Sequence, residues 1–356
     1  MYAVIMAGGK GTRFWPLSRE KRPKHLLSIT GEKSIIKYTV ERIAPLVPED
    51  NIMIVTGESH SDEIKQELAS LPEENIIVEP IGRNTAPCIG LAAVHIRKKD
   101  PDAVMVVMPS DHLIGDEKNF ISVLSDAADI AKKSDHLVTI GIQPTKPETG
   151  YGYIERGNAF EATGNAAIYE VQSFREKPDL ATAETFFKNG NFYWNSGMFI
   201  WKVSTLLESI EKFLPDLYKD LLTIERSLGT DRESEVVAQV YGDIDPISID
   251  YGIMEKAKNV LMMPGDFAWS DVGSWDVLWE VLEKDENGNV LKGKALSIDT
   301  ADSLVFGSDK LITLVGVKDL IVVETADSLL VCDKNASQDV KKLVEKLEKK
   351  NMKEYL

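Results

Sequence analysis

The first half of the chain alternates short apolar runs with amphipathic segments, and this alternation constrains the fold more than any other feature. The strand-like runs are residues 2–6, 51–55, 104–108 and 137–142. Apolar residues at helical spacing lie between them, at 34–46, 86–97 and 120–132. Short apolar strands joined by helices are typical of a mostly parallel sheet with helices on both faces. We therefore expect an α/β, Rossmann-like fold whose ligands bind at the carboxyl ends of the strands.

The pattern changes in the second half of the chain. Residues 151–155 and 167–174 are predicted to be longer antiparallel strands. The sequence TADSLVFGSD begins at Thr300 and TADSLLVCDK begins at Thr325, a repeat of 25 residues. Such a repeat predicts stacked β-coils, none of which can bury its apolar face alone.

The chain closes with a predicted helix that begins after Ser337, the expected N-cap. Its apolar face is formed by Val340, Leu343, Val344 and Leu347. We expect a main domain at residues 1–285. A small β-helix-like domain with this terminal helix is expected at residues 286–356.

Composition excludes several classes of function. The 356 residues carry a net charge of -16, which disfavours binding to nucleic acid. The two cysteines, Cys88 and Cys332, form no disulfide framework. No run is long enough to cross a membrane, and no leader-like segment precedes the first strand. The five histidines show no zinc-binding spacing. We expect a cytoplasmic protein.

A glycine-rich loop follows the first predicted strand, with the sequence MAGGKGTRFWPLS from Met6. Glycines let the backbone present N–H groups to an anion. The loop matches neither a P-loop nor a dinucleotide fingerprint, which would need a third glycine at Phe14. A plain turn is the alternative interpretation. Lys10, Arg13 and Lys24 favour an anion site, because these cations would repel one another without an anion between them.

Five motifs in order resemble the sugar-nucleotide pyrophosphorylases, a family of sugar-1-phosphate nucleotidyltransferases. They are AGGKGTRFWPLS with RPKHLL from residue 7, EPIGRNTAP from Glu79, FREKP from Phe174, WNSGMF from Trp194 and FAWSDVGSW from Phe267. The second, fourth and fifth are similar to the branch that uses GTP and mannose 1-phosphate. One departure is Arg175, where the family motif commonly has valine. The resemblance covers nearly the whole chain.

The resemblance implies that GMP is transferred from GTP to mannose 1-phosphate, giving GDP-mannose and pyrophosphate. A sugar phosphate is already largely dianionic near neutral pH, so the reaction needs charge neutralisation and alignment and no general base. The catalytic residues are expected to be Arg13, Lys24, Asp111 and Asp271. The two carboxylates, Asp111 and Asp271, are expected to hold Mg²⁺ together with nucleotide phosphates.

The resemblance also assigns binding residues. The nucleotide is expected to contact Gly8, Gly9, Lys10, Gly11, Thr12, Arg13, Glu79, Asn84, Ala86 and Asp111. The sugar phosphate is expected to contact Gly150, Glu176, Lys177 and Asn195. Lys177 would bind the phosphate, whereas Glu176 and Asn195 would bind hydroxyl groups.

Two other interpretations stay open at this point. The same fold could serve another nucleotide or another sugar phosphate, or the chain could be an inactive sugar-nucleotide sensor. The C-terminal repeat also favours a homodimer over a simple lid. Some long relatives carry a further isomerase domain, whereas this sequence closes at Leu356 with only the repeat and a helix. We therefore expect no isomerase activity.

Overall fold

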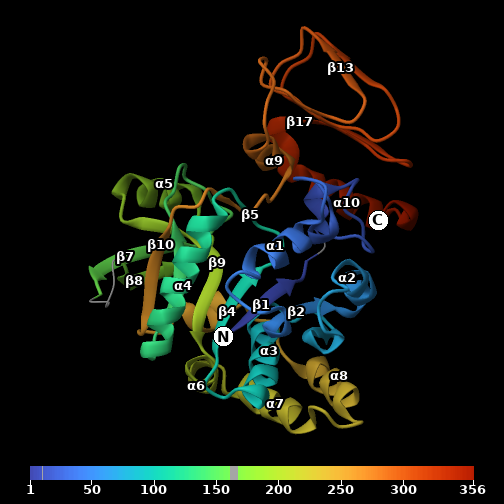
Figure 1. Ribbon diagram of the computed structural model, residues 1–356. Coiled ribbons are helices and arrows are strands. Elements are labelled where there is room, and N and C mark those ends of the chain that lie inside the picture. Colours follow the sequence, from blue (N-terminus) through green and yellow to red (C-terminus); the bar gives the residue numbers. More distant parts are fainter. Residues whose placement is uncertain (10, 161–166) are drawn as a thin grey trace. The chain divides into compact units, whose positions relative to one another are not determined.

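The computed structural model describes residues 1–9, 11–160 and 167–356, so Lys10 lies outside the described residues (Figure 1). The chain forms two compact units, each assembled from separate segments. The first unit comprises residues 1–8, 39–110 and 114–269. The second unit comprises residues 9–38, 111–113 and 270–356.

A nine-stranded sheet organises the first unit. Its spatial order is β3 (Ile76–Glu79), β2 (Ile52–Gly57), β1 (Tyr2–Ala7), β4 (Val104–Pro109), β9 (Phe192–Lys202), β6 (Leu137–Ile142), β10 (Val260–Gly265), β8 (Tyr169–Arg175) and β7 (Tyr153–Ala159). Strands β1 to β4 are parallel, with Ile5 paired to both Ile54 and Met108. Strands β8 and β9 run against their neighbours. The expected α/β fold with a mostly parallel sheet is confirmed.

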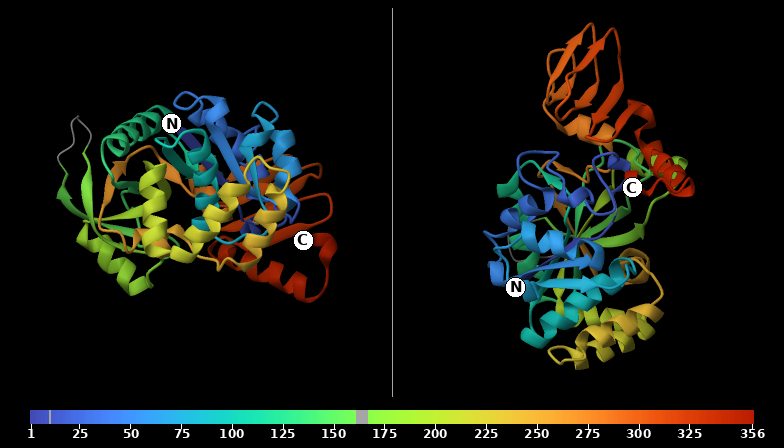
Figure 2. Two further views of the ribbon diagram at one scale, coloured as in Figure 1. Left: turned by 90° about the horizontal axis from the view of Figure 1, so that it is seen from below. Right: turned by 90° about the vertical axis from the view of Figure 1, so that its right-hand side faces the viewer.

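Helices cover both faces of this sheet (Figure 2). The helices of the first unit are α2 (Ser61–Glu67), α3 (Thr85–Lys99), α4 (Glu117–Lys133), α5 (Leu180–Asn189), α6 (Val203–Phe213), α7 (Pro215–Ser227) and α8 (Glu233–Asp243). Short 3-10 turns are η3 (Glu49–Asn51), η4 (Glu58–His60) and η5 (Glu73–Asn75), and η6 (Asp250–Met254) is a π-helical turn. Because both faces are covered, the parallel strands β1 and β4 are apolar along their whole length rather than alternating.

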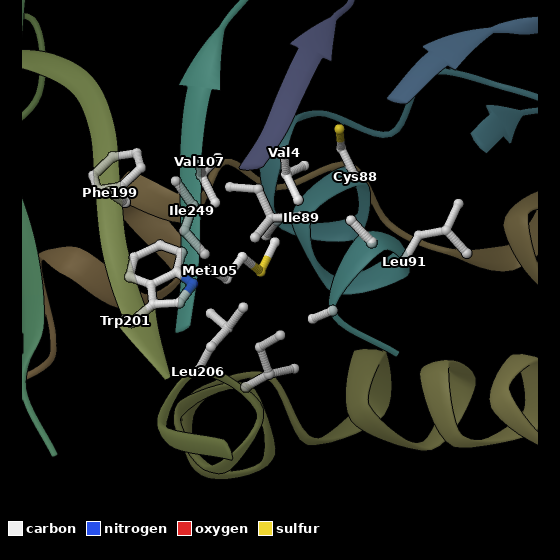
Figure 3. Packing of buried hydrophobic residues seen from close by; sticks show 14 of the residues in the cluster. Val4, Cys88, Ile89, Leu91, Met105, Val107, Phe199, Trp201, Leu206 and Ile249 are labelled. Atoms are coloured by element: carbon white, nitrogen blue, oxygen red, sulfur yellow. The ribbon is translucent and has the colours of Figure 1, made fainter. Parts of the chain in front are cut away.

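The core of the first unit lies between the sheet and helices α3 and α6 (Figure 3). Val4, Met105 and Trp201 point from neighbouring strands towards these helices and are almost completely buried. Ile89 on α3 and Leu206 on α6 complete this layer. Trp201 is therefore a core residue.

Short β-coils form much of the C-terminal segment of the second unit. Strands β12 (Val290–Lys292), β14 (Leu304–Phe306), β16 (Leu320–Glu324) and β17 (Leu329–Asp333) make one sheet, and β13 (Ala295–Ile298) pairs with β15 (Ile312–Val315). Two further strands, β5 (Leu113–Ile114) and β11 (Trp269–Ser270), pair with each other. The β-helix-like element is confirmed, since β12, β14 and β16 stack in parallel register.

The 25-residue sequence repeat is not the structural repeat of these coils. Leu304 and Leu329 occupy equivalent positions of the two sequence copies. In the structure Leu304 pairs with Ile321 of β16, and Leu329 pairs with Glu324 at the far end of the same strand. The two copies therefore flank β16 from opposite sides, the first in parallel and the second in antiparallel register.

The remaining helices of the chain are α1 (Ile35–Ile43), α9 (Trp275–Val281) and α10 (Val340–Lys349), with 3-10 turns η1 (Thr12–Phe14), η2 (Lys24–Leu26), η7 (Lys334–Asp339) and η8 (Lys353–Tyr355). Ser337 is not the N-cap of the terminal helix, which corrects the sequence prediction. It lies inside η7, and its hydroxyl donates a hydrogen bond to Asp276 instead. The predicted apolar face of α10 is confirmed, because Val340 and Val344 are buried against Phe14 and Trp275 in one cluster.

The segment after α10 is tied to the loop that follows η1. Trp15 Nε1 donates a hydrogen bond to the carbonyl oxygen of Tyr355 at 2.8 Å, and the Arg19 guanidinium donates to the same oxygen. Arg19 also forms an ion pair with Asp327 at 2.7 Å. The glycine-rich loop of the second unit is thus held by residues from the far end of the sequence.

Candidate functional site

Gly11 fixes the geometry of the glycine-rich loop. Its φ of 60° lies in the left-handed region, and a Cβ built there would lie 2.5 Å from Lys24 Cβ and 2.9 Å from the Lys24 backbone nitrogen. Any side chain at this position would therefore be strained and would push the two segments apart. Because Gly11 has no side chain, η1 and η2 can pack against each other, and Lys24 lines the same cavity as Arg13.

Lys24 is a buried cation with two fixed partners. Its side chain is only 7% exposed, and its Nζ lies 2.9 Å from Asp111 Oδ2. The same Nζ donates to the backbone carbonyl oxygen of Asp271 at 2.5 Å. An ammonium has three N–H groups, so these two contacts leave one donor for a ligand.

Asp111 is held in its ionised form by the charges around it. Burial would raise the pKa of the carboxyl, but Lys24, His112 and His25 outweigh this effect and lower the pKa below its ordinary value. Asp111 is therefore negatively charged at neutral pH. A charged carboxylate is what a hard cation requires as a ligand.

These residues surround a cavity of about 290 Å³ in the second unit. It is lined by Gly11, Thr12, Arg13, Phe14, Lys24, Asp111, His112, Asp271, Gly273 and Lys341. The sequence predicts six of these residues and misses the other four. In the described part of the chain, no carboxylate forms an ion pair with Arg13 and no hydrogen bond holds its side chain. The cavity thus combines an uncommitted guanidinium with two carboxylates, a combination suited to phosphate groups and a metal ion.

The donor set fits a magnesium ion that is shared with a substrate. Asp111 and Asp271 line the same cavity. Among the residues the structure describes, no group of three or more histidine, cysteine or carboxylate side chains could hold a metal on its own. Mg²⁺ commonly binds to one or two carboxylates and completes its shell with substrate phosphates and water.

The segment predicted to bind the nucleotide, residues 79–86, lies in the first unit and is hydrogen-bonded to helix α8. Arg83 donates to the carbonyl oxygens of Tyr241 at 2.8 Å and Gly242 at 2.6 Å. The Asn84 side chain accepts a hydrogen bond from Thr85 N at 2.8 Å and caps α3, while the φ of Asn84 is 71°. Asn84 therefore uses its side-chain oxygen locally and keeps its amide N–H groups for a ligand.

Glu79 ends β3 in a buried position. Burial raises the pKa of its carboxyl to about 7, and hydrogen bonds from Tyr241 and Cys88 oppose that rise. Its Oε1 has no hydrogen-bond partner in the described structure. Ala86, the third predicted residue of this segment, is completely buried, and its backbone N–H is bonded to Ile247 O. Direct base contacts from these two side chains stay a prediction.

The predicted sugar-phosphate residues meet in the first unit. Lys177 Nζ lies 2.5 Å from Glu176 Oε1. The other carboxylate oxygen of Glu176 is buried without a partner in the described structure, in a side chain only 9% exposed. A Cβ on Gly152 would clash with this oxygen and would lie 3.2 Å from Asn195 Cβ. Gly152 therefore leaves the space beside Glu176 open, whereas Gly150 meets only Glu148.

Asn195 is oriented by a carboxylate that the sequence prediction missed. Its Nδ2 donates to Asp250 Oδ1 at 2.9 Å, and its Oδ1 accepts from Gly197 N at 3.1 Å. One amide N–H remains for a ligand. Burial and then the charge of Glu176 raise the pKa of Asp250 to about 7, although Lys177 and Asn195 oppose the rise. An acidic residue within the apolar stretch ISIDYGIM was the signal that could have identified Asp250.

The predicted residues therefore fall into three groups. Arg13, Lys24, Asp111 and Asp271 line one cavity of the second unit, together with Gly11 and Thr12. Glu176, Lys177 and Asn195 form a second cluster around Gly152, and Glu79, Asn84 and Ala86 lie along β3 and α3. Gly8 and Gly9 follow β1, with nothing within 4 Å of a Cβ built on either.

Comparison with known proteins places the chain in a family. Residues 2–288 match the nucleotidyl transferase family, and residues 293–347 match the mannose-phosphate isomerase/GMP-like β-helix domain. The chain is 43% identical over 358 aligned residues to a mannose-1-phosphate guanylyltransferase from Salmonella montevideo, covering 99% of this chain and 75% of that protein. The chain belongs to the mannose-1-phosphate guanylyltransferase family of nucleotidyl transferases.

Solved structures agree with this family. A crystal structure from Thermus thermophilus, described as mannose-1-phosphate geranyltransferase, shares 33% identity and a TM-score of 0.87, covering 98% of this chain and 99% of that chain. A structure described as mannose-6-phosphate isomerase from Helicobacter pylori shares 30% identity with a TM-score of 0.60, covering 76% of this chain and 98% of that chain. For this member of the guanylyltransferase family, the absence of isomerase activity stays a prediction.

No helix in the described part of this family member is both long and apolar enough to cross a membrane.

Proposed function

We propose that the chain transfers GMP from GTP to α-D-mannose 1-phosphate and releases pyrophosphate. The new bond joins a phosphate oxygen of the sugar to the α-phosphorus, and the bond to the departing β-phosphate breaks. The observation that carries this proposal is the single cavity that contains Arg13, Lys24, Asp111 and Asp271. Family membership supports both the nucleotide and the sugar phosphate.

Charge neutralisation is the main task of the cavity residues. The attacking phosphate and the triphosphate are both anions, so cations and N–H donors must offset their repulsion. Arg13 would bind the departing pyrophosphate through two parallel hydrogen bonds. The third N–H of Lys24 would face the α-phosphate, and the backbone of Gly11 and Thr12 would bind phosphate oxygens.

Lys24 has a second role, which the structure suggests and the sequence did not. It binds the Asp111 carboxylate and the Asp271 backbone at once, so it orients the two candidate metal ligands. Nucleotidyl transferases of this family generally use a divalent metal ion. We propose that this ion is Mg²⁺, held by Asp111 and Asp271. When bound, it neutralises charge on the phosphates.

The cluster around Gly152 would bind the sugar phosphate. Lys177 is 61% exposed and offers its charge to the phosphate, although it already contacts Glu176. The unpartnered oxygen of Glu176 would accept a hydrogen bond from a sugar hydroxyl, and the free N–H of Asn195 would donate a hydrogen bond to another. Gly150 would contribute backbone contacts beside them.

The segment from Glu79 to Ala86 would bind the nucleoside, together with Gly8, Gly9 and Lys10. Asn84 keeps two amide N–H donors, which suit an acceptor on a base or a ribose.

Two further parts of the proposal concern the whole chain. The boundary between the main domain and the C-terminal domain would lie after residue 285, and the protein would be located in the cytoplasm.

The C-terminal coils would mediate a homodimer. Leu296, Ile298 and Val315 are 62%, 62% and 67% exposed, and Ile298 pairs with Val315 across β13 and β15. Leu329 and Val331 on β17 are also exposed. Apolar patches of this kind on a protein surface commonly mark an interface.

A substrate panel tests the proposed activity. Four nucleoside triphosphates would be combined with the 1-phosphates of mannose, glucose and galactose, and magnesium-dependent pyrophosphate release would be measured. We expect GTP with mannose 1-phosphate to give the highest kcat/KM. A higher value for another pair would support the alternative specificity, and no release with any pair would favour the sensor.

A further inference from the structure

We propose that Lys341, on the C-terminal helix α10, binds the terminal phosphates of the nucleoside triphosphate and the pyrophosphate derived from them. This inference rests on the proposed function and adds a residue that the sequence motifs do not include. Lys341 lines the same cavity as Arg13, Lys24, Asp111 and Asp271. It would make the C-terminal helix part of the nucleotide-binding site.

The position of Lys341 is fixed by the core beside it. Val340 and Val344 are 4% and 6% exposed and pack in one hydrophobic cluster with Phe14, the last residue of η1. Helix α10 is therefore packed against the turn that carries Arg13. Lys341 directly follows Val340, so its side chain starts from an anchored backbone and needs only its own flexible stem to reach a ligand.

Lys341 is one of the cavity cations whose charge remains available for a ligand. Lys24 is neutralised by Asp111 at 2.9 Å and also bonds to the Asp271 carbonyl. Arg13 and Lys341 are the cavity cations that no close carboxylate neutralises in the described structure. The nearest partner of Lys341 is Glu345 at 4.0 Å, an exposed pair one helical turn away that contributes little.

A pyrophosphate group carries several negative charges and needs more than one cation. Arg13 and Lys341 come from η1 and α10, two elements of the second unit that pack together. A ligand that bridges them would join the two elements. The two carboxylates of the cavity would repel the same group unless a metal ion lay between them, so these two cations are suited to the phosphates farther from the metal.

The next residue offers a matched control. Lys342 lies on the same helix, is 74% exposed and forms an ion pair with Asp339 at 2.7 Å. It does not line the cavity. The variants K341E and K342E therefore change the net charge equally at neighbouring positions, and only the first changes the cavity.

The experiment measures binding of inorganic pyrophosphate to the full chain by titration calorimetry, in magnesium chloride. We expect K341E to weaken binding about tenfold and K341A about threefold, with K341R close to wild type. K342E should stay within about twofold, and the difference should shrink as salt is added. In kinetics, KM for GTP should rise in K341E while KM for mannose 1-phosphate stays unchanged.

Equal weakening by K341E and K342E would show only diffuse electrostatics and would overturn the inference. So would a wild-type protein that does not bind pyrophosphate, or a change in KM for mannose 1-phosphate alone. A wild-type protein that binds pyrophosphate but makes no GDP-mannose would refute the proposed function. The pyrophosphate titrations of K341E and K342E would in that case still decide whether Lys341 binds pyrophosphate. Thermal melting checks that each variant is folded.

Discussion

Lys24 Nζ lies 2.9 Å from Asp111 Oδ2, and the same atom bonds to the backbone of the Asp271 loop. One buried cation thus connects the two acidic residues that the sequence places far apart. This arrangement is possible because Gly11 has no side chain, which lets the Lys24 backbone pack directly against it. The predictions below test the arrangement one residue at a time.

Replacing Lys24 with Met removes the charge and keeps the length of the side chain. Asp111 and the Asp271 loop would lose the cation that binds them both, and the α-phosphate would lose its proposed N–H donor. We expect kcat for GDP-mannose formation to drop about 10²- to 10³-fold, as when one preorganised donor is lost from an active site. Lys65→Met breaks an ion pair with Glu73 on the surface and should leave kcat unchanged. A K24M protein with wild-type kcat would show that Lys24 does not take part in the reaction.

Gly11→Ala should destabilise the loop. The new Cβ would meet the Lys24 backbone at less than 3 Å, and its φ of 60° disfavours alanine. We expect the free energy of unfolding to fall by about 1–3 kcal/mol. Gly8→Ala serves as the control for stability, since nothing lies within 4 Å of its Cβ. Urea titration of both variants measures the difference, and equal stabilities would contradict the close packing of Gly11 on Lys24.

The variants D111N and D271N should shift the magnesium dependence of the reaction. Each removes one negative oxygen ligand while keeping the size of the side chain. We expect the magnesium concentration for half-maximal rate to rise about 10- to 100-fold. Asp129→Asn, on the exposed side of α4, is the matched control. An unchanged magnesium curve in D111N and D271N would rule out the proposed ligands.

Asp250→Asn should change how stability depends on pH. The pKa of Asp250 is about 7 in the folded chain, against about 4 when unfolded. Between these values the folded state keeps a proton that the unfolded chain has lost, so the contribution of Asp250 to stability falls as pH rises and stays lost above pH 7. The free energy of unfolding of D250N relative to wild type should therefore grow from about pH 4 to about pH 7 and stay constant above that.

Urea titrations of both proteins at several pH values measure this difference. Glu79 titrates in the same range, but it is present in both proteins and cancels. A difference that does not vary with pH would mean that Asp250 is ionised throughout.

Ile298→Glu should separate the proposed dimer. The change puts a charge at the end of β13, beside the exposed Val315 of β15, and burying that charge at an interface would be costly. Light scattering should give half the wild-type mass. Leu180→Glu, at a side chain 56% exposed on α5, should not change the mass. A wild-type protein of monomer mass would refute the dimer directly.

The sequence predicted the local elements better than their pairing. Strands β1, β2, β4 and β6 are short apolar runs that can be recognised within a window of a few residues. The insertion of β9 between β4 and β6, against their direction, joins segments distant in sequence, and periodicity carries no signal for such pairing. The TADSL repeat does not predict the strand pairing either, because the similar sequences at Leu304 and Leu329 lie on opposite sides of β16.

The candidate site shows the same division. Motifs identified Arg13, Lys24 and Asp271, because each of these residues lies in a motif whose local sequence is distinctive. Asp111 lies outside the five motifs, just after an apolar strand whose carboxyl end is expected to bind ligands. Asp250 and Lys341 lie outside those motifs, and only packing shows their role. Asp250 is found through its hydrogen bond to Asn195, and Lys341 through the cavity that it shares with Arg13.

The carbonyl oxygen of Tyr355 accepts hydrogen bonds from both Trp15 and Arg19. If this segment came loose, two donors near the glycine-rich loop would lose a partner together, at a cost of about 1–3 kcal/mol for each donor that stays buried. Local opening near residue 355 and local opening near residue 15 are therefore one event. The glycine-rich loop, and with it the proposed nucleotide site, is thus linked to residues that do not line the cavity.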